Sequence, residues 1–243
     1  MNKRRLAVFV EGQTELVFVR EFLKQWYGYD ANVIDFACYS LQNNEFRDAE
    51  YQYGSEDSEN YFMLVNVGND NSVLSNILSR LAYLVSQGYQ LVIGLRDMYS
   101  KQYVQDAGGH VIDKEVNQKH IDAVRDVLKG ATNGEKVEFH FAIMEVEAWL
   151  LGMHDYLLSF DKRLTSDYIK DITGVDLDTD PEKTIVHPAV ELGKIYGLVG
   201  KQYDKHLSDI ETIMSILTTD DFCKLMDSGK CHTFKMFVES LLN

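Results

Sequence analysis

The segment Arg5–Phe18, RLAVFVEGQTELVF, most constrains how this chain can fold. Its first half is a short apolar run that predicts a buried β-strand over Arg5–Val10, followed directly by the polar turn EGQTE. Thr14 is expected to cap the amphipathic helix that follows, because its hydroxyl can accept a backbone N–H hydrogen bond. Ligands of open α/β sheets bind beyond the carboxyl ends of the strands, so Glu11 marks a candidate functional position.

Apolar runs and amphipathic segments alternate along the first part of the chain. The pattern predicts four more strands, over Val33–Leu41, Tyr61–Val67, Gln90–Leu95 and Val137–Ile143. Gln90–Leu95 (QLVIGL) is apolar throughout, as expected of a central strand that is buried on both faces. We therefore predict an α/β fold with a Rossmann-like, mainly parallel sheet flanked by helices.

The connections between the predicted strands and the second part of the chain do not show this alternation of strands and helices. Residues 42–60 are expected to form an exposed excursion and residues 98–113 a mobile loop, with helices starting near Ser72 and over His120–Leu128. From Asp155 onward the sequence predicts only helical segments, over residues 165–172, 187–196, 205–217, 220–226 and 233–242. The predicted domains are an α/β core of residues 1–153 and a helical C-terminal region of residues 154–243 packed on it.

Charge and hydropathy exclude some classes of function. The chain has 243 residues, of which 38 are acidic and 24 basic, for a net charge of −14. A general nucleic-acid coat is excluded, because nonspecific binding depends on Lys and Arg at the phosphates. A nuclease would need a bound metal, a local basic groove or a basic partner. No run of about 18 apolar residues predicts a membrane span, and the apolar start is too short for a signal peptide, so we expect a cytoplasmic protein with no membrane contact.

Acidic residues follow the predicted strands at four positions. Asp97 comes after QLVIGL, and Glu145 and Glu147 come after the next strand, as Glu11 does after the first. Because parallel strands place their carboxyl ends at one edge of the sheet, we expect these side chains to converge. Neighbouring carboxylates repel unless a cation neutralises them, and Mg²⁺ (or Mn²⁺) prefers such oxygen ligands. We therefore predict a metal site among these carboxylates.

Each of these carboxylates also has an ordinary structural explanation. Asp97 could pair with Arg96, and Glu147 could simply open a helix, where its charge complements the helix dipole. Glu145 and Glu147 would point the same way only while the backbone between them stays extended.

Basic residues and histidines supply weaker candidates. Lys194, Lys201 and Lys205 would share one side of the segment between Glu191 and Leu207 if it were helical, and could then bind substrate phosphates. A solvated helix face explains the same pattern. His110 lies in the predicted loop after Asp97 and is a candidate for substrate contact.

The strand–EGQTE, strand–Asp and strand–EVEAWLL motifs together resemble Toprim-related proteins of bacteria. Primases, topoisomerases and overcoming-lysogenisation-defect nucleases share that fold, and the chain is most similar to a branch often encoded beside ATPases in phage-defence loci. The resemblance implies that Glu11 is the Toprim glutamate, which acts as a general acid or base or lies near the metal. It implies that Asp97 is the first acid of the metal-binding DxD motif. Tyr99 stands in place of the second acid, so either the metal site is weaker or Glu145 and Glu147 supply the missing oxygens. Together with the strand-end positions, the resemblance implies that Asp97, Glu145 and Glu147 hold the metal and that Glu11 and Asp97 are catalytic.

These observations lead to two main expectations of function. The first is a Mg²⁺-dependent nuclease effector of phage defence that acts on DNA or RNA. The second is a regulatory or scaffold subunit that binds a partner ATPase, which Tyr99 and the negative charge both favour. The chain has no GxxxxGK[ST] loop, so any ATP hydrolysis would belong to a partner. A small-molecule phosphotransfer enzyme is a third alternative, and association between copies of the chain is left open.

Overall fold

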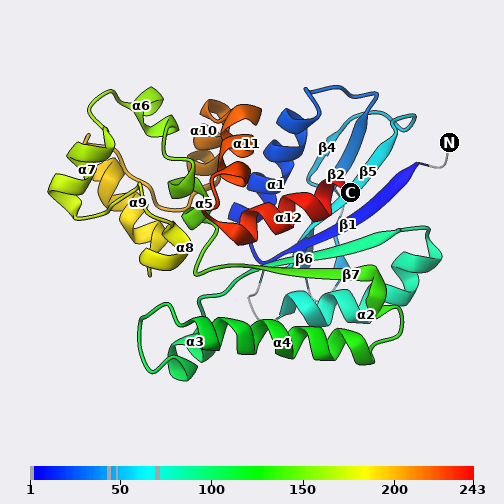
Figure 1. Ribbon diagram of the computed structural model, residues 1–243. Helices are drawn as coiled ribbons and strands as arrows, with labels where there is room; N and C mark the ends of the chain where they lie inside the picture. The colour runs from blue at the N-terminus through cyan, green and yellow to red at the C-terminus, as the bar shows by residue number, and fades with distance from the viewer. Residues whose placement is uncertain (1–2, 43–44, 48, 69–71) are drawn as a thin grey trace. The chain divides into compact units, whose positions relative to one another are not determined.

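A computed structural model describes residues 3–42, 45–47, 49–68 and 72–243 (Figure 1). The strands are β1 (Arg4–Val10), β2 (Ile34–Gln42), β3 (Glu45–Phe46), β4 (Tyr51–Tyr53), β5 (Asn60–Asn66), β6 (Leu91–Asp97) and β7 (Val137–Ala142). The first helices are α1 (Gln13–Trp26), α2 (Val73–Ser86), α3 (Lys101–Asp106), α4 (Lys114–Gly130) and the 3₁₀ helix η2 (Gly134–Lys136). The later helices are α5 (Glu147–Gly152), α6 (Tyr156–Phe160), α7 (Ser166–Thr173), α8 (Pro181–Thr184), α9 (Pro188–Gly197), α10 (Leu207–Ile216), α11 (Thr219–Asp227) and α12 (His232–Leu242).

The chain divides into two compact units. Unit 1 comprises Met1–Arg96, Lys119–Phe141 and Ser240–Asn243, and unit 2 comprises Asp97–Gln118 and Ala142–Glu239. Unit 1 carries the sheet, and unit 2 is built from helices and loops. The units do not follow the predicted domains one for one, because unit 2 includes residues 97–118 and 142–153 of the predicted core.

Unit 1 contains a mixed, mostly parallel sheet. Its seven strands among the described residues run in the order β3-β2-β5-β1-β6-β7, with β4 also paired to β2. β1 pairs in parallel with β5 and β6, and β2 pairs in parallel with β5. The antiparallel strands β3 and β4 come from the segment expected to be an exposed excursion, which instead extends the sheet beside β2. The predicted α/β fold with a mainly parallel, helix-flanked sheet is confirmed.

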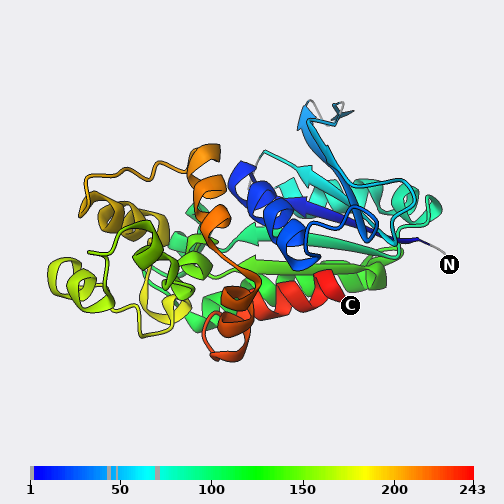
Figure 2. The same cartoon turned by 90° about the horizontal axis from the view of Figure 1, so that it is seen from above.

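Helices cover the sheet of unit 1 on both faces. Figure 1 shows α1 on one face and α2 with α4 on the other, and the view from above places α1 across the strands (Figure 2). The alternation of side chains along β1 explains this arrangement: Ala7 and Phe9 pack into the cluster formed with α2, together with Ile77 and Leu81. The face of β1 that carries Ala7 and Phe9 is therefore covered by the apolar stripe of α2.

The turn after β1 differs from the prediction in one detail. Helix α1 begins at Gln13, so Thr14 lies inside the helix and Gly12 occupies the capping position. The Gly12 N–H donates to Glu15 Oε2 at 2.8 Å, which satisfies a backbone group that the helix leaves unpaired. The expectation that Thr14 caps the helix was wrong, because the helix begins one residue before Thr14, which therefore lies within the first turn.

Unit 2 gathers its helices around α5, which contacts α8 and α9 (Figure 1). The side chain of Trp149 in α5 is fully buried and stacks on Phe237 of α12 with ring centroids 5.6 Å apart. Its indole N–H donates to Glu182 Oε1 at 3.0 Å. The helical C-terminal region is confirmed, and helix α3 forms within the stretch that was expected to be a loop.

Helix length and hydropathy bear on the membrane prediction. Within the described part of the chain, no helix combines the length and the apolar character that crossing a membrane requires.

Candidate metal centre

Asp97 is the last residue of β6 and the first residue of unit 2. Its side chain is largely buried, with 8% of the residue exposed. Oδ1 accepts a hydrogen bond from the Val146 N–H at 3.0 Å. Asp97 is thus hydrogen-bonded to the segment that carries Glu145 and Glu147, the other two acids of the site.

Glu145 and Glu147 follow β7 through a tight change of direction. Met144 takes a left-handed backbone conformation with φ of 64°, and Val146 is already helical, so the backbone between the two acids is not extended. Glu147 is the first residue of α5, as the dipole argument allowed. Both carboxylates nevertheless reach the same place, so the expected requirement for extended backbone was wrong.

The three carboxylates form one cluster, which we call the acidic cluster. One oxygen from each of Asp97, Glu145 and Glu147 lies within 4.8 Å of the others. The Ala189 N–H at the start of α9 donates to Glu145 Oε2 at 2.9 Å, and the Tyr203 hydroxyl donates to Glu147 Oε1 at 2.8 Å. Donors from separate elements therefore hold the cluster in place.

Lys205 places an ammonium group in the acidic cluster. Its Nζ lies 2.9 Å from Glu145 Oε1 and 3.2 Å from Glu147 Oε1. Both glutamates are therefore paired with a basic side chain, which comes from about 60 residues further along the chain. Such pairing is an ordinary structural explanation for a carboxylate. One ammonium among three carboxylates leaves the cluster negatively charged if all three are ionised.

The pKa values of Glu147 and Lys205 are both raised, the first by burial and the second by neighbouring charges. Glu147 is fully buried, with 0% exposed, and this burial raises the pKa of its carboxyl although Lys205 opposes the rise. Burial alone would lower the pKa of Lys205, but the charges of Glu147, Asp97 and Glu145 outweigh it and raise that pKa. The ammonium is thus held in its charged form by the acids.

The donor set of the acidic cluster fits a small divalent cation. Glu147 Oε2 is buried and has no hydrogen-bond partner in the described part of the chain, although it lies beside two further carboxylates. Carboxylate oxygens are the ligands that Mg²⁺ and Mn²⁺ prefer. The three residues could therefore hold a metal ion, and the cation would share the cluster with the Lys205 ammonium or displace it.

The other predicted site residues lie elsewhere. Glu11 follows β1 in unit 1, and its convergence with the acidic cluster stays a prediction. Helix α9 ends at Gly197, so Lys194, Lys201 and Lys205 do not share one helix face. Lys194 is exposed and pairs with Glu191 at 2.8 Å, and Lys201 lies in the loop before α10.

Three rings, those of Tyr99, His110 and His187, come together in unit 2, and we call them the ring cluster. The Tyr99 hydroxyl and His110 Nδ1 are 2.6 Å apart, and the ring centroid of His187 lies 5.1 Å from that of Tyr99. The sequence suggested only His110, because nothing local connects residues 99, 110 and 187. The positive φ angles of Gly108 and Gly109 at the end of α3 mark the turn that returns the chain to Tyr99.

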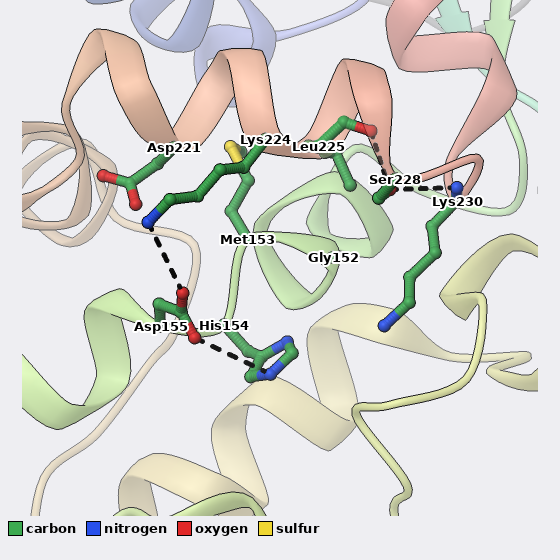
Figure 3. Close-up of a pocket in the computed structure, with 9 residues that line it drawn as sticks. All are labelled: Gly152, Met153, His154, Asp155, Asp221, Lys224, Leu225, Ser228 and Lys230. Atoms are coloured by element: carbon green, nitrogen blue, oxygen red, sulfur yellow. Dashed lines mark hydrogen bonds and ion pairs between the residues drawn. The ribbon is translucent and has the colours of Figure 1, made fainter.

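Unit 2 also has a hollow that does not involve the acidic cluster (Figure 3). Between α5 and α11, Asp155 lies 4.0 Å from His154 and 3.9 Å from Lys224. Burial lowers the pKa of His154, although Asp155 opposes the change. Asp155 is thus the carboxylate that lies nearest the basic side chains of this hollow, and the three clustered carboxylates are not among the residues that line it.

Comparison of the chain with protein-family models, with curated proteins and with solved structures finds no match.

Proposed function

We propose that this protein is a divalent-cation-dependent phosphodiester hydrolase that acts on nucleic acid, as a nuclease effector of bacterial phage defence. The observation that carries the proposal is the buried, unpartnered Oε2 of Glu147 within a cluster of three carboxylates. Burying such an oxygen is costly unless a ligand uses it. The resemblance of the EGQTE and EVEAWLL motifs to Toprim-related proteins supports the same reading.

Asp97, Glu145 and Glu147 would hold Mg²⁺ or Mn²⁺. Such a cation supplies Lewis-acid polarisation of a phosphate and acidification of bound water. The chain contributes orientation: the Val146 N–H, the Ala189 N–H and the Tyr203 hydroxyl hold one carboxylate each. Glu11 is proposed to manage the proton of the attacking or leaving oxygen, a role taken over from the resemblance.

The test is cleavage of plasmid DNA, single-stranded DNA and tRNA by the purified protein with Mg²⁺ or Mn²⁺. Asp97→Asn and Glu147→Gln keep the side-chain shape but remove a charged ligand. We expect each to lower the cleavage rate by more than about 100-fold, since even outer-shell partners of a metal are worth 10- to 100-fold. Glu11→Gln tests the proposed proton-handling role in the same assay.

The matched control is Asp126→Asn on α4, which makes the same change of charge at a largely exposed carboxylate paired with Lys129. It should cleave at the wild-type rate. Wild-type rates in both Asp97→Asn and Glu147→Gln would refute the catalytic role of the acidic cluster.

A specific observation favours the second candidate, a regulatory or scaffold subunit that binds a partner ATPase. The Lys205 ammonium already neutralises part of the acidic cluster, which is how a structural ion-pair network would be arranged. This candidate predicts no Mn²⁺ binding in isothermal titration calorimetry and no cleavage with any partner present. Mn²⁺ binding that is lost in Glu147→Gln would exclude it.

A further inference from the structure

The ring cluster combines three side chains that can stack with another ring. Tyr99 meets His187 edge-on at an interplanar angle of 80°, and His110 lies 5.3 Å from His187 between centroids. Tyr99 and His187 are half-buried, and His110 is exposed. The hydrogen bond between Tyr99 and His110 fixes the rings relative to each other while part of their surface faces solvent.

Two backbone anchors tie the ring cluster to the acidic cluster. The Tyr99 N–H donates to the Met144 carbonyl at 3.0 Å, directly before Glu145. His187 stands two residues before Ala189, whose N–H donates to Glu145 Oε2. The Cα atoms of residues two positions apart are at most about 7 Å from each other, so a nucleotide at the acidic cluster would have the rings within reach of its base.

The net charge and the pairing of the lysines argue against phosphate binding by lysine side chains. The chain has a net charge of −14, and the ammonium groups of Lys194 and Lys205 are paired with carboxylates. Affinity for a nucleic acid beyond what a bound metal ion supplies must then come largely from contacts other than ion pairs with lysine. Base stacking on aromatic side chains is such a contact and tolerates any base sequence.

We propose that the ring cluster of Tyr99, His110 and His187 binds an unpaired nucleobase, so that the substrate is single-stranded nucleic acid. This inference rests on the proposed function, since the base is held beside a phosphate at the acidic cluster. Bases in a duplex are covered by their neighbours on both faces, and only an unstacked base offers its face to a side chain. His187 also lines a pocket with the apolar residues Val175, Ile185 and Val186, which gives the base or its neighbour room.

Binding can be measured apart from cleavage by fluorescence anisotropy in Ca²⁺, which accepts oxygen ligands. The probes are fluorescein-labelled oligothymidylate and oligouridylate, an abasic strand of equal length, and a duplex. We expect both single strands to bind roughly tenfold more tightly than the abasic strand and the duplex, and His187→Ala and Tyr99→Ala to lose that advantage. The His187 side chain makes no capping hydrogen bond to α9, so its truncation should leave the fold intact.

Tyr168→Ala removes an exposed ring of α7 and, as the matched control, should bind as the wild type does. Tyr99→Phe keeps the ring but loses the hydrogen bond to His110, so it should keep more of the single-strand preference than Tyr99→Ala. Equal binding of the abasic strand, or wild-type binding by His187→Ala, overturns the inference. If either result is found while the wild type still cleaves nucleic acid and binds Mn²⁺, the proposed function stands and only the base-binding inference is lost. Loss of both Mn²⁺ binding and cleavage in the wild type removes the proposed function, and this inference with it.

Discussion

Lys205 is the residue whose environment most affects the interpretation of the site. It has a left-handed backbone conformation with φ of 59°, which is unfavourable for a residue with a side chain. Its ion pairs with Glu145 and Glu147 and the neighbouring hydrogen bond from Tyr203 offset that cost. Strained residues of this kind concentrate at functional sites, which agrees with a role for Lys205 as an internal counter-ion of the acidic cluster.

Lys205→Met should destabilise the protein without metal and strengthen its binding of Mn²⁺. Removing the ammonium leaves Glu147 buried without its counter-charge, which costs 3–5 kcal/mol when a pair is fully buried. Because the Lys205 side chain is 36% exposed, we expect a loss of about 2 kcal/mol in the free energy of unfolding. Urea unfolding with and without Mn²⁺ measures both effects, since the added cation should restore part of the loss.

The control is Lys194→Met, which removes an exposed ion pair with Glu191 and should cost less than about 1 kcal/mol. If Lys205→Met and Lys194→Met unfold at the same urea concentration, Lys205 is not the counter-ion described here.

Among the elements, β6 is the one on which the position of the site most depends, because it ends at Asp97. It pairs in parallel with β1, and its apolar residues are buried as expected of a central strand. Gly94 sits in this strand where Phe139 of β7 and Ile77 of α2 approach the backbone. A glycine inside a strand often marks such a close approach.

Gly94→Ala should therefore lower the free energy of unfolding. A Cβ there would lie 2.5 Å from the Phe139 ring and 2.9 Å from Ile77 Cδ1, so both side chains would have to move. Overpacking of this kind costs about 1–3 kcal/mol. Gly130→Ala at the end of α4 meets nothing within 4 Å and serves as the control. Thermal unfolding that is no lower for Gly94→Ala than for Gly130→Ala would contradict the packing described for β6.

At the scale of the whole molecule, buried histidines make stability depend on pH. His140 lies in β7 with its side chain 11% exposed, and burial lowers the pKa of its imidazole to about 4, although Glu138 opposes the shift. The Ser240 hydroxyl lies 2.9 Å from His140 Nε2. Burial also lowers the pKa of His154 in unit 2, so both units lose stability when their histidines must take up protons.

The free energy of unfolding should fall as the pH drops from about 7 toward 4, because the unfolded chain binds the His140 proton first. The ordinary pKa is 6.5 and the folded value about 4, so His140 accounts for a loss of about 3 kcal/mol at most. His140→Gln should flatten this dependence in urea unfolding, while His232→Gln at an exposed position should not. A pH dependence that is unchanged in His140→Gln would contradict the buried, neutral imidazole.

The local sequence alone determined β1, β2, β5, β6 and β7, most of the helices and the acids at the strand ends, but not the short strands β3 and β4. Apolar periodicity reflects which face each element buries, and parallel strands place their carboxyl ends together, so Asp97, Glu145 and Glu147 could be expected to meet. Only the tertiary structure decided that Lys205 enters that group and that Tyr99, His110 and His187 form a ring cluster. These contacts join loops separated by up to about 90 positions, and no short-range pattern encodes which loop will face which. The packing of the helices of unit 2, among them α5 with α8 and α9, decides which of the connecting loops meet.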